Sequence, residues 1–236
     1  MPTKTVSIKV NHAEHNIVPG LTTGLDIAKA GQIPDTMQLL FKVSEIDIPV
    51  QEADCILIRG GEEFSIVEKS SQIDDNPPLK HSISFQFSTR QAPIENAILY
   101  AKVMGSELRA LAGGNTIDLW ADLDGVADSL IEDTHRLILQ SQDRFFTAPH
   151  DEGDRFYEVT VIFDGAPSQR RFPALMTVQE AIRRCLPPKD KPLVNEFEMV
   201  DGDIGTQPLN QSFTLKAAGV RSEHVLSITK KNGGGG

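Results

Sequence analysis

Few residues of the chain have the types and spacing that catalytic or metal-binding chemistry requires. His12-Ala13-Glu14-His15 offers two imidazoles and a carboxylate, but it lacks metalloprotease spacing and the paired cysteines of a zinc deaminase. We interpret it as a solvated turn. Cys55 and Cys185 lie in apolar runs and are predicted to be buried free thiols. No serine, cysteine or carboxylate pair has a context typical of catalysis, so we expect no catalytic residue, no metal, no cofactor and no enzyme.

Gly60-Gly61-Glu62-Glu63-Phe64 matches the signature of diguanylate cyclases, in which a glycine hairpin cradles GTP phosphates. Those enzymes need a larger domain and an upstream metal-binding aspartate in an Asp-x-Asp-x-Phe context, which residues 1–59 lack. The turn expected at the equivalent place later in the chain, Ser141-Gln142-Asp143-Arg144-Phe145, keeps only the phenylalanine. We therefore predict that Gly60-Gly61 is a hairpin turn and that Phe64 belongs to the core.

The net charge of −10 is unevenly spread along the 236 residues. Residues 1–153 hold 12 basic and 23 acidic side chains, whereas residues 154–236 hold 11 and 10. The acidic part disfavours nucleic-acid binding, which needs a basic face to neutralise phosphates. No stretch approaches the ~18 apolar residues of a membrane span, and residues 1–10 have no apolar core of the signal-peptide type. We expect a cytoplasmic protein with no nucleic-acid or membrane partner.

Two polar, proline-bearing segments are predicted to be linkers, because such sequences favour neither a helix nor a strand ladder. They divide the chain into small pieces, each of which can fold alone around a compact core. The expected organisation is domain 1–69, linker 70–79, domain 80–147, linker 148–154, domain 155–229 and a flexible glycine tail at 230–236.

The first two domains are predicted to be copies of one another, because similar residues recur at an offset of 81. The matching pairs are Gly24 and Gly105, Asp26 and Glu107, Ile27 and Leu108, Leu57 and Ile138, Ile58 and Leu139, and Phe64 and Phe145. Each copy begins with an alternating strand, at residues 6–10 or 83–87, and continues with a short helix, at 24–30 or 106–112. A strand at 39–43 and a hairpin joining 55–58 to 64–67 follow, which indicates a small α+β domain.

The third domain has the clearest pattern. Its predicted elements are a strand at 157–163, a turn at Asp164-Gly165, a return strand from Arg170, a helix ended by Leu186-Pro187-Pro188, and strands at 193–200 and 224–229. Thr177 and Glu180 have the spacing of a capping box at the start of the helix. Val178, Ala181, Ile182 and Cys185 follow at helical spacing and give the helix one apolar face.

This order of elements resembles ubiquitin over the whole third domain. The shared marks are the hairpin, the capped helix ended by two prolines, the strand closing on Asp201-Gly202, the Thr214-Leu215 turn, and a last strand running into glycines. The tandem arrangement resembles bacterial multi-ubiquitin-domain proteins. The resemblance implies an α+β fold of tandem β-grasp (ubiquitin-like) domains, two divergent repeats followed by a more ubiquitin-like terminal domain.

The same resemblance implies a protein modifier. Its partners would be a ubiquitin-activating-like enzyme, a ubiquitin-conjugating-like enzyme, a metalloprotease of the deubiquitinase type, and target proteins, in an antiviral (phage-defence) setting. Gly233, Gly234, Gly235 and Gly236 would be the conjugation tail, since glycine alone offers an extended, side-chain-free backbone that threads a narrow channel. Lys230, Lys231 and Asn232 would be read by the activating enzyme. The alternative for the two lysines is a solvated strand edge.

Two other functions share parts of this pattern. A sulfur carrier of the thiamine or molybdopterin type has the same fold and a glycine tail that forms a C-terminal thiocarboxylate, but such carriers are usually one small domain. A non-covalent interaction scaffold would carry the glycine tail incidentally, since glycine-rich ends are common flexible segments. Counting from Ile228, the ubiquitin-equivalent pair is Gly234-Gly235, which leaves open which glycine is the working terminus.

Overall fold

The chain is a mixed α+β protein, and its computed structural model contains two compact units. The first unit comprises Met1–Asp124 and Ser129–Thr147, and the second comprises Gly125–Asp128 and Ala148–Gly236. The residues described are 5–43, 45–69, 74–86, 94–114, 117–123, 127–140, 143–151 and 153–231. Within them no helix is long and apolar enough to cross a membrane.

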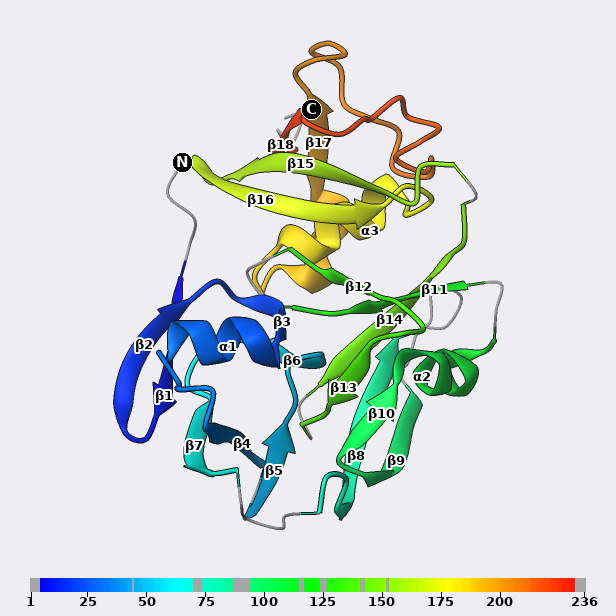
Figure 1. Cartoon of the computed structure of the whole chain (residues 1–236). Coiled ribbons are helices and arrows are strands. Elements are labelled where there is room, and N and C mark those ends of the chain that lie inside the picture. Colours follow the sequence, from blue (N-terminus) through cyan, green and yellow to red (C-terminus); the bar gives the residue numbers. More distant parts are fainter. Residues whose placement is uncertain are drawn as a thin grey trace. The chain divides into compact units, whose positions relative to one another are not determined.

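The first sheet is built from the residues of the expected first domain. Its strands are β1 (Val6–Val10), β2 (Ala13–Ile17), β4 (Met37–Val43), β5 (Ile46–Val50) and β7 (Glu63–Glu68). They lie in the order β2-β1-β7-β4-β5, with β1 and β7 parallel. Helix α1 (Gly24–Ala30) lies over one face of this sheet (Figure 1) and buries Ile27 there. The helix bounds agree with the prediction.

A second sheet in the first unit repeats this arrangement. Its strands are β8 (Pro78–Gln86), β9 (Ile94–Tyr100), β11 (Ile117–Ala121), β12 (Ser129–Ile131) and β14 (Arg144–Pro149), and α2 (Gly105–Ala112) precedes β11 in the chain. Its order, β9-β8-β14-β11-β12, corresponds strand by strand to that of the first sheet. The β8–β14 pair is parallel, as is the β1–β7 pair.

A third sheet joins these two halves into one body. The strands β3 (Gly20–Thr23), β6 (Asp54–Ile58), β10 (Lys102–Met104) and β13 (Arg136–Ile138) form a sheet in the order β10-β13-β6-β3 (Figure 1). The corresponding strands β6 and β13 pair in parallel at its centre. Every residue of β6 is buried, as expected of a strand covered on both faces. We call these four strands the shared sheet.

The shared sheet also completes the apolar core of the first half. That core is formed around Ile8, Phe41 and Phe64, and it includes Ala101 and Ile138 from the second half. Phe64 is 4% exposed and stacks on Phe41 with ring centroids 4.9 Å apart. The prediction that Phe64 is a core residue is therefore confirmed, while the core itself extends beyond the range 1–69.

The hairpin predicted across Gly60-Gly61 is wrong. β6 pairs with β3 and β13 in the shared sheet, whereas β7 pairs with β1 and β4 in the first sheet. Gly60 and Gly61 have φ values of +111° and +89°, which glycine adopts without steric cost. The two glycines thus carry the chain from one sheet into another. The local turn signal was correct, but turn residues alone do not determine which strands pair.

The segment 70–79, expected to be a linker, belongs to the first unit. Its described part, from Asp74 onward, is joined to the rest of that unit by hydrogen bonds and by strand pairing. Pro78 is the first residue of β8 and pairs with Tyr100, so the prediction that this segment holds no ladder is wrong there. Proline is tolerated at the first position of a strand because its missing N–H is not needed. Asn76 accepts a 2.8 Å hydrogen bond from the backbone N of Lys102.

A buried charge cluster lies where the shared sheet meets this segment. The Nζ of Lys102 is 2.7 Å from Asp54 Oδ2 and 2.7 Å from Asp75 Oδ1, and the side chains of Lys102 and Asp54 are each 1% exposed. Arg136 pairs with Asp75 and lies 3.6 Å from Asp54. Burial alone would raise the pKa of Asp75, but hydrogen bonds from Lys102, Arg136 and Gln51 outweigh it and lower this pKa to about 2. We call Asp54, Asp75, Lys102 and Arg136 the junction cluster.

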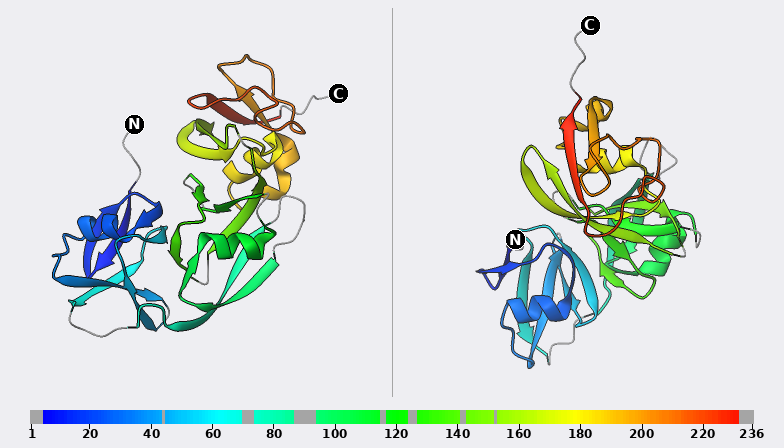
Figure 2. Two further views of the ribbon diagram at one scale, coloured as in Figure 1. Left: turned by 45° about the vertical axis from the view of Figure 1, so that its right-hand side comes forward. Right: turned by 90° about the horizontal axis from the view of Figure 1, so that it is seen from above.

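The second unit contains one sheet and the third helix. Its strands are β15 (Phe156–Phe163), β16 (Ala166–Pro173), β17 (Phe197–Asp201) and β18 (Val225–Lys230), in the order β16-β15-β18-β17, with β15 and β18 parallel. Figure 2 shows α3 (Val178–Cys185, yellow) beside the sheet that contains β18 (red). Val178, Ala181 and Ile182 are fully buried. The hydroxyl of Thr177 accepts the Glu180 amide at 3.2 Å, as the capping pattern predicts.

The strand predicted at 193–200 is wrong in its first half. Lys191–Glu196 forms a 3-10 helix, η1, and β17 begins at Phe197. The physical reason is Pro192 in the first turn of η1, which fits the start of a helix but cannot donate to a ladder. The amide of Leu193 instead donates to the Asp190 carbonyl at 2.9 Å.

Removing the ammonium of the junction cluster tests its contribution to stability. Lys102→Met should lower the free energy of unfolding by up to about 3–5 kcal/mol, because buried Asp54 would keep only Arg136, 3.6 Å away, as a cationic partner. Urea denaturation followed by circular dichroism measures this change. The control is Lys9→Met, whose ion pair with Glu63 is 46% and 56% exposed and should cost less than about 1 kcal/mol. Equal losses in the two variants would contradict the prediction.

A second charge pair, Arg59 and Asp143, connects the turns that follow β6 and β13 and predicts a pH dependence of stability. Burial raises the pKa of Asp143 to about 6, although the guanidinium of Arg59, 2.7 Å away, lowers it. As pH rises from about 4 to 6 the unfolded chain releases this proton before the folded one does. The free energy of unfolding should therefore fall over that interval, by up to about 3 kcal/mol for this group. Wild type should show this fall relative to Asp143→Asn in urea titrations. Parallel pH profiles for the two proteins would exclude it.

Candidate functional site

The candidate site is the end of β18, where the chain leaves the sheet of the second unit. β18 forms there because Leu226 and Ile228 alternate into the core, 0% and 3% exposed, as one face of a half-buried strand requires. It lies between β15 and β17, and its register with β17 continues to the pair Phe197 and Lys230. Asn232, Gly233, Gly234, Gly235 and Gly236 lie outside the described residues.

The two lysines at this end each have partners on the neighbouring segment. The Nζ of Lys230 is 3.0 Å from Glu196 Oε2. The backbone N of Lys231 donates to the Glu196 carbonyl at 2.7 Å, and its Nζ donates to the Asn195 carbonyl at 2.8 Å. Sequence reasoning selected the lysines but not Asn195 or Glu196, because these lie more than 30 positions earlier in the chain and inside a range predicted to be strand.

A pocket of about 550 Å³ opens beside the end of β18. Its apolar lining comes from Ile162, Phe163, Phe197 and Ile228, and its polar lining includes Asp164, Asp190 and Lys230. The rings of Phe163 and Phe197 lie 6.0 Å apart at an interplanar angle of 59°. Asp164 and Gly165 have φ values of +50° and +74°, which is typical of the tight hairpin turn predicted there.

A second polar group of the second unit was missed by sequence reasoning. Asp201, Asp203 and His224 bring ligand-type atoms within 4.8 Å of one another. His224 Nδ1 lies 2.7 Å from Asp201 Oδ2, and Asp203 Oδ2 accepts the Val225 amide at 2.8 Å. These bonds tie the turn after β17 to the start of β18, so we interpret the group as a structural brace. His224 lies 23 positions after Asp201, so no local sequence motif connects the three residues.

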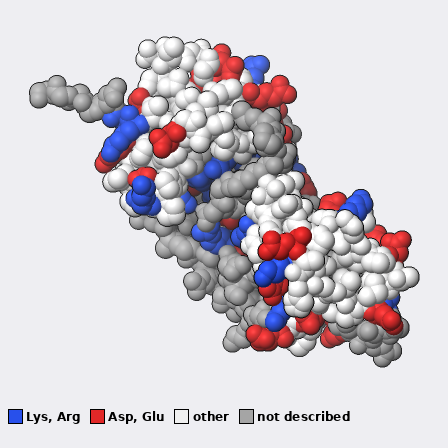
Figure 3. Space-filling view, turned by 90° about the vertical axis from the view of Figure 1, so that its left-hand side faces the viewer, with Lys and Arg blue, Asp and Glu red and all other residues white. Residues whose placement is uncertain are grey.

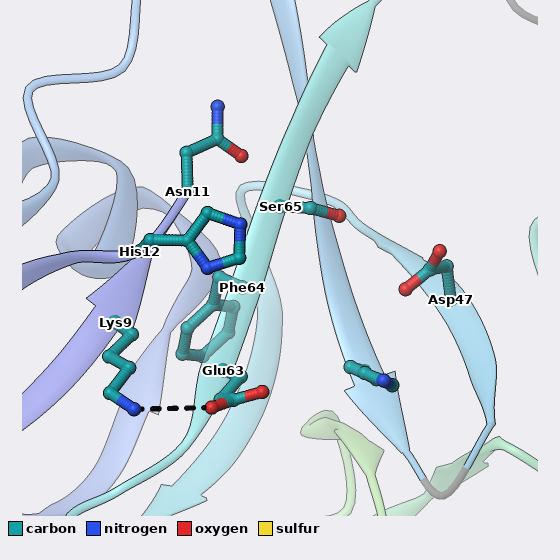
Figure 4. A pocket seen from close by; sticks show the side chains of 8 residues that line it. Lys9, Asn11, His12, Asp47, Glu63, Phe64 and Ser65 are labelled. Atoms are coloured by element: carbon teal, nitrogen blue, oxygen red, sulfur yellow. Dashed lines mark hydrogen bonds and ion pairs between the residues drawn. The ribbon is translucent and has the colours of Figure 1, made fainter.

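The structure brings together two motifs of the first unit that sequence reasoning treated separately. His12 and Glu63 both line a pocket of about 150 Å³ on the first sheet, with Lys9 and Asp47 among the other lining residues. Figure 4 shows Lys9 paired with Glu63 at 3.4 Å, and Asp47 on the opposite side of the pocket. Lys9, Glu63, Lys42 and Asp47 lie on successive neighbouring strands. Such alternating cross-strand charges stabilise a sheet modestly.

The surface charges do not single out a further site on the face drawn in Figure 3. Acidic and basic side chains are interspersed there among the described residues.

No protein-family model matches the chain, and no curated protein matches it.

Both thiols are free but poorly suited to act as nucleophiles. Cys55 is buried and Cys185 is partly buried. Burial, and for Cys55 also the charge of Asp54, raises their pKa values to about 11 and about 12. Only the thiolate reacts, so neither residue is activated.

Alkylation tests this assignment. At pH 8, iodoacetamide should modify Cys55 and Cys185 in the folded chain at least about 100-fold more slowly than in the urea-unfolded chain, because a pKa raised by two units or more leaves little thiolate. Intact-mass time courses under the two conditions measure the rates. A thiol that reacts at its unfolded rate in the native protein would contradict the assignment.

Proposed function

We propose that the chain is a ubiquitin-like protein modifier built of tandem β-grasp domains. It would be conjugated to target proteins through the carboxylate of a glycine in residues 233–236. The observation that carries the proposal is the arrangement of β15 and β18. The first and last strands of the second unit are parallel neighbours, the hairpin β15–β16 and helix α3 precede β17, and β18 leads directly into two lysines and the glycine run.

The proposed chemistry lies at the glycine run, and partner enzymes carry it out. A carboxylate does not react with amines until it is activated, here by adenylation with ATP and transfer to an enzyme thiol. Glycine suits this handling because its backbone adopts extended conformations without a side chain. The chain would thus be a substrate of an activating enzyme, a conjugating enzyme and a deconjugating metalloprotease. It needs no catalytic residue of its own for this role.

The first unit would act as a built-in recognition body. Two sheets with corresponding strand orders support its interpretation as two divergent β-grasp copies. Backbone packing supports it further: a Cβ on Gly24 would lie 2.1 Å from the Gln51 carbonyl oxygen, and one on Gly105 would lie 2.0 Å from that of Glu132. Both pairs are related by the same offset of 81 residues. Because the shared sheet joins the copies, we expect them to stay joined during conjugation.

One experiment tests the proposal. The protein is incubated with ATP and the activating enzyme of its source, and intact mass is measured before and after reductant. The proposal expects a thiol-labile adduct of protein and enzyme, absent from a matched variant truncated after Asn232. In a parallel reaction supplied with a persulfide donor, replacement of one carboxylate oxygen by sulfur would instead identify a sulfur carrier. No adduct, together with full cellular function of the truncated variant, would overturn the proposal in favour of a scaffold.

A further inference from the structure

The last two residues of η1, Asn195 and Glu196, contact the two lysines that precede the glycine run. Glu196 contacts both lysines, Lys230 through its carboxylate at 3.0 Å and Lys231 through its carbonyl at 2.7 Å. The Lys231 ammonium also donates a 2.8 Å hydrogen bond to the Asn195 carbonyl. We call these four residues the lysine clamp.

The clamp is itself anchored to the body of the second unit. The side-chain oxygen of Asn195 accepts a 2.6 Å hydrogen bond from Gln179 on α3. The carbonyl of Phe197, the next residue after Glu196, accepts a 2.6 Å bond from Gln211. The bond from Lys231 N to Glu196 O continues the β17–β18 ladder by one residue beyond the pair Phe197 and Lys230. The last described residue is thus held by both its backbone and its side chain.

The lysine clamp holds Lys231, which directly precedes Asn232 and the glycine run in the sequence. The segment from Asn232 to Gly236 can span at most ~18 Å when extended, and release of both lysines would add ~7 Å. A segment whose preceding residue is held in place loses less conformational freedom when an enzyme channel orders it. The clamp therefore affects how readily a partner captures the glycine run.

We propose that Glu196 is a positioning residue for the glycine run, acting through Lys230 and Lys231. This inference rests on the proposed function, because it concerns delivery of the same carboxylate. Glu196 makes no contact with the reacting atoms. It keeps the exit point of the chain at Lys231, and its carboxylate keeps the Lys230 ammonium beside β17.

Tail cleavage by trypsin tests the clamp without any partner. Trypsin cuts after lysine only in chain that opens locally, so Glu196→Gln should speed loss of residues 232–236 about two- to fivefold, the range expected for an exposed ion pair. Intact mass during brief native digestion measures the rate. The matched control, Glu198→Gln two residues along β17, should cleave at the wild-type rate. Equal rates for Glu196→Gln and wild type would overturn the proposal.

Amide hydrogen exchange provides a second test, in which a charge-swapped pair serves as the rescue. Hydrogen exchange at the Lys231 amide should accelerate in Glu196→Gln, and it should slow again in the charge-swapped pair Glu196→Lys with Lys230→Glu. Failure of the swap to restore protection would show that the ion pair does not act as proposed.

Kinetics with the activating enzyme separate this inference from the proposed function. Glu196→Gln should raise KM for the modifier severalfold and leave kcat unchanged, since positioning affects capture and not the adenylation step. Unchanged KM would overturn the positioning role. If wild type is not adenylated at all while cleavage and exchange respond as expected, the proposed function fails and the clamp stands as a structural feature.

Discussion

The parallel pairing of β6 with β13 is the constraint on which the first unit depends. It puts two corresponding strands side by side, buries β6 on both faces, and brings Ile138 into the core of the first half. Burial on both faces leaves no room for solvent around charge. Asp54 is therefore tolerated because Lys102 lies 2.7 Å away and Arg136 lies 3.6 Å away, and leaving these buried charges unpaired would be costly. The two halves thus share strands, core and ions, and they should behave as one cooperative body.

Equivalent turn positions in the two halves accept the same backbone hydrogen bond, although the residue type differs. Glu62 accepts the amide of Arg59 at 2.7 Å, and Asp143 accepts the amide of Gln140 at 2.9 Å, each three residues before the carboxylate. Both carboxylates close the turn after a shared-sheet strand. Only Asp143 also receives the guanidinium of Arg59 from the other half, so one member of the pair has become part of the junction between halves.

The second unit has the same parallel pairing of its first and last strands, β15 and β18, as the first sheet has in β1 and β7. The end of β18 therefore lies within the sheet, between β15 and β17. Helix α3 ends at two prolines, and η1 then returns the chain to β17 with Asn195 and Glu196 at its end. That route places a carboxylate and two carbonyls beside the lysines that precede the glycine run. The clamp is thus a product of the connection between α3 and β17.

The sequence alone determined the local features of this protein. The bounds of α1, the cap at Thr177, the turn at Asp164-Gly165, the burial of Phe64 and the position of the lysines before the glycine run follow from spacing, turn chemistry and apolar period. The tertiary structure decided which strands pair. It separated β6 from β7, drew Pro78 into a ladder, and brought Glu196 to Lys230. The physical reason is that strand pairing and ion pairing join residues far apart in the chain, and local preference carries no information about such partners.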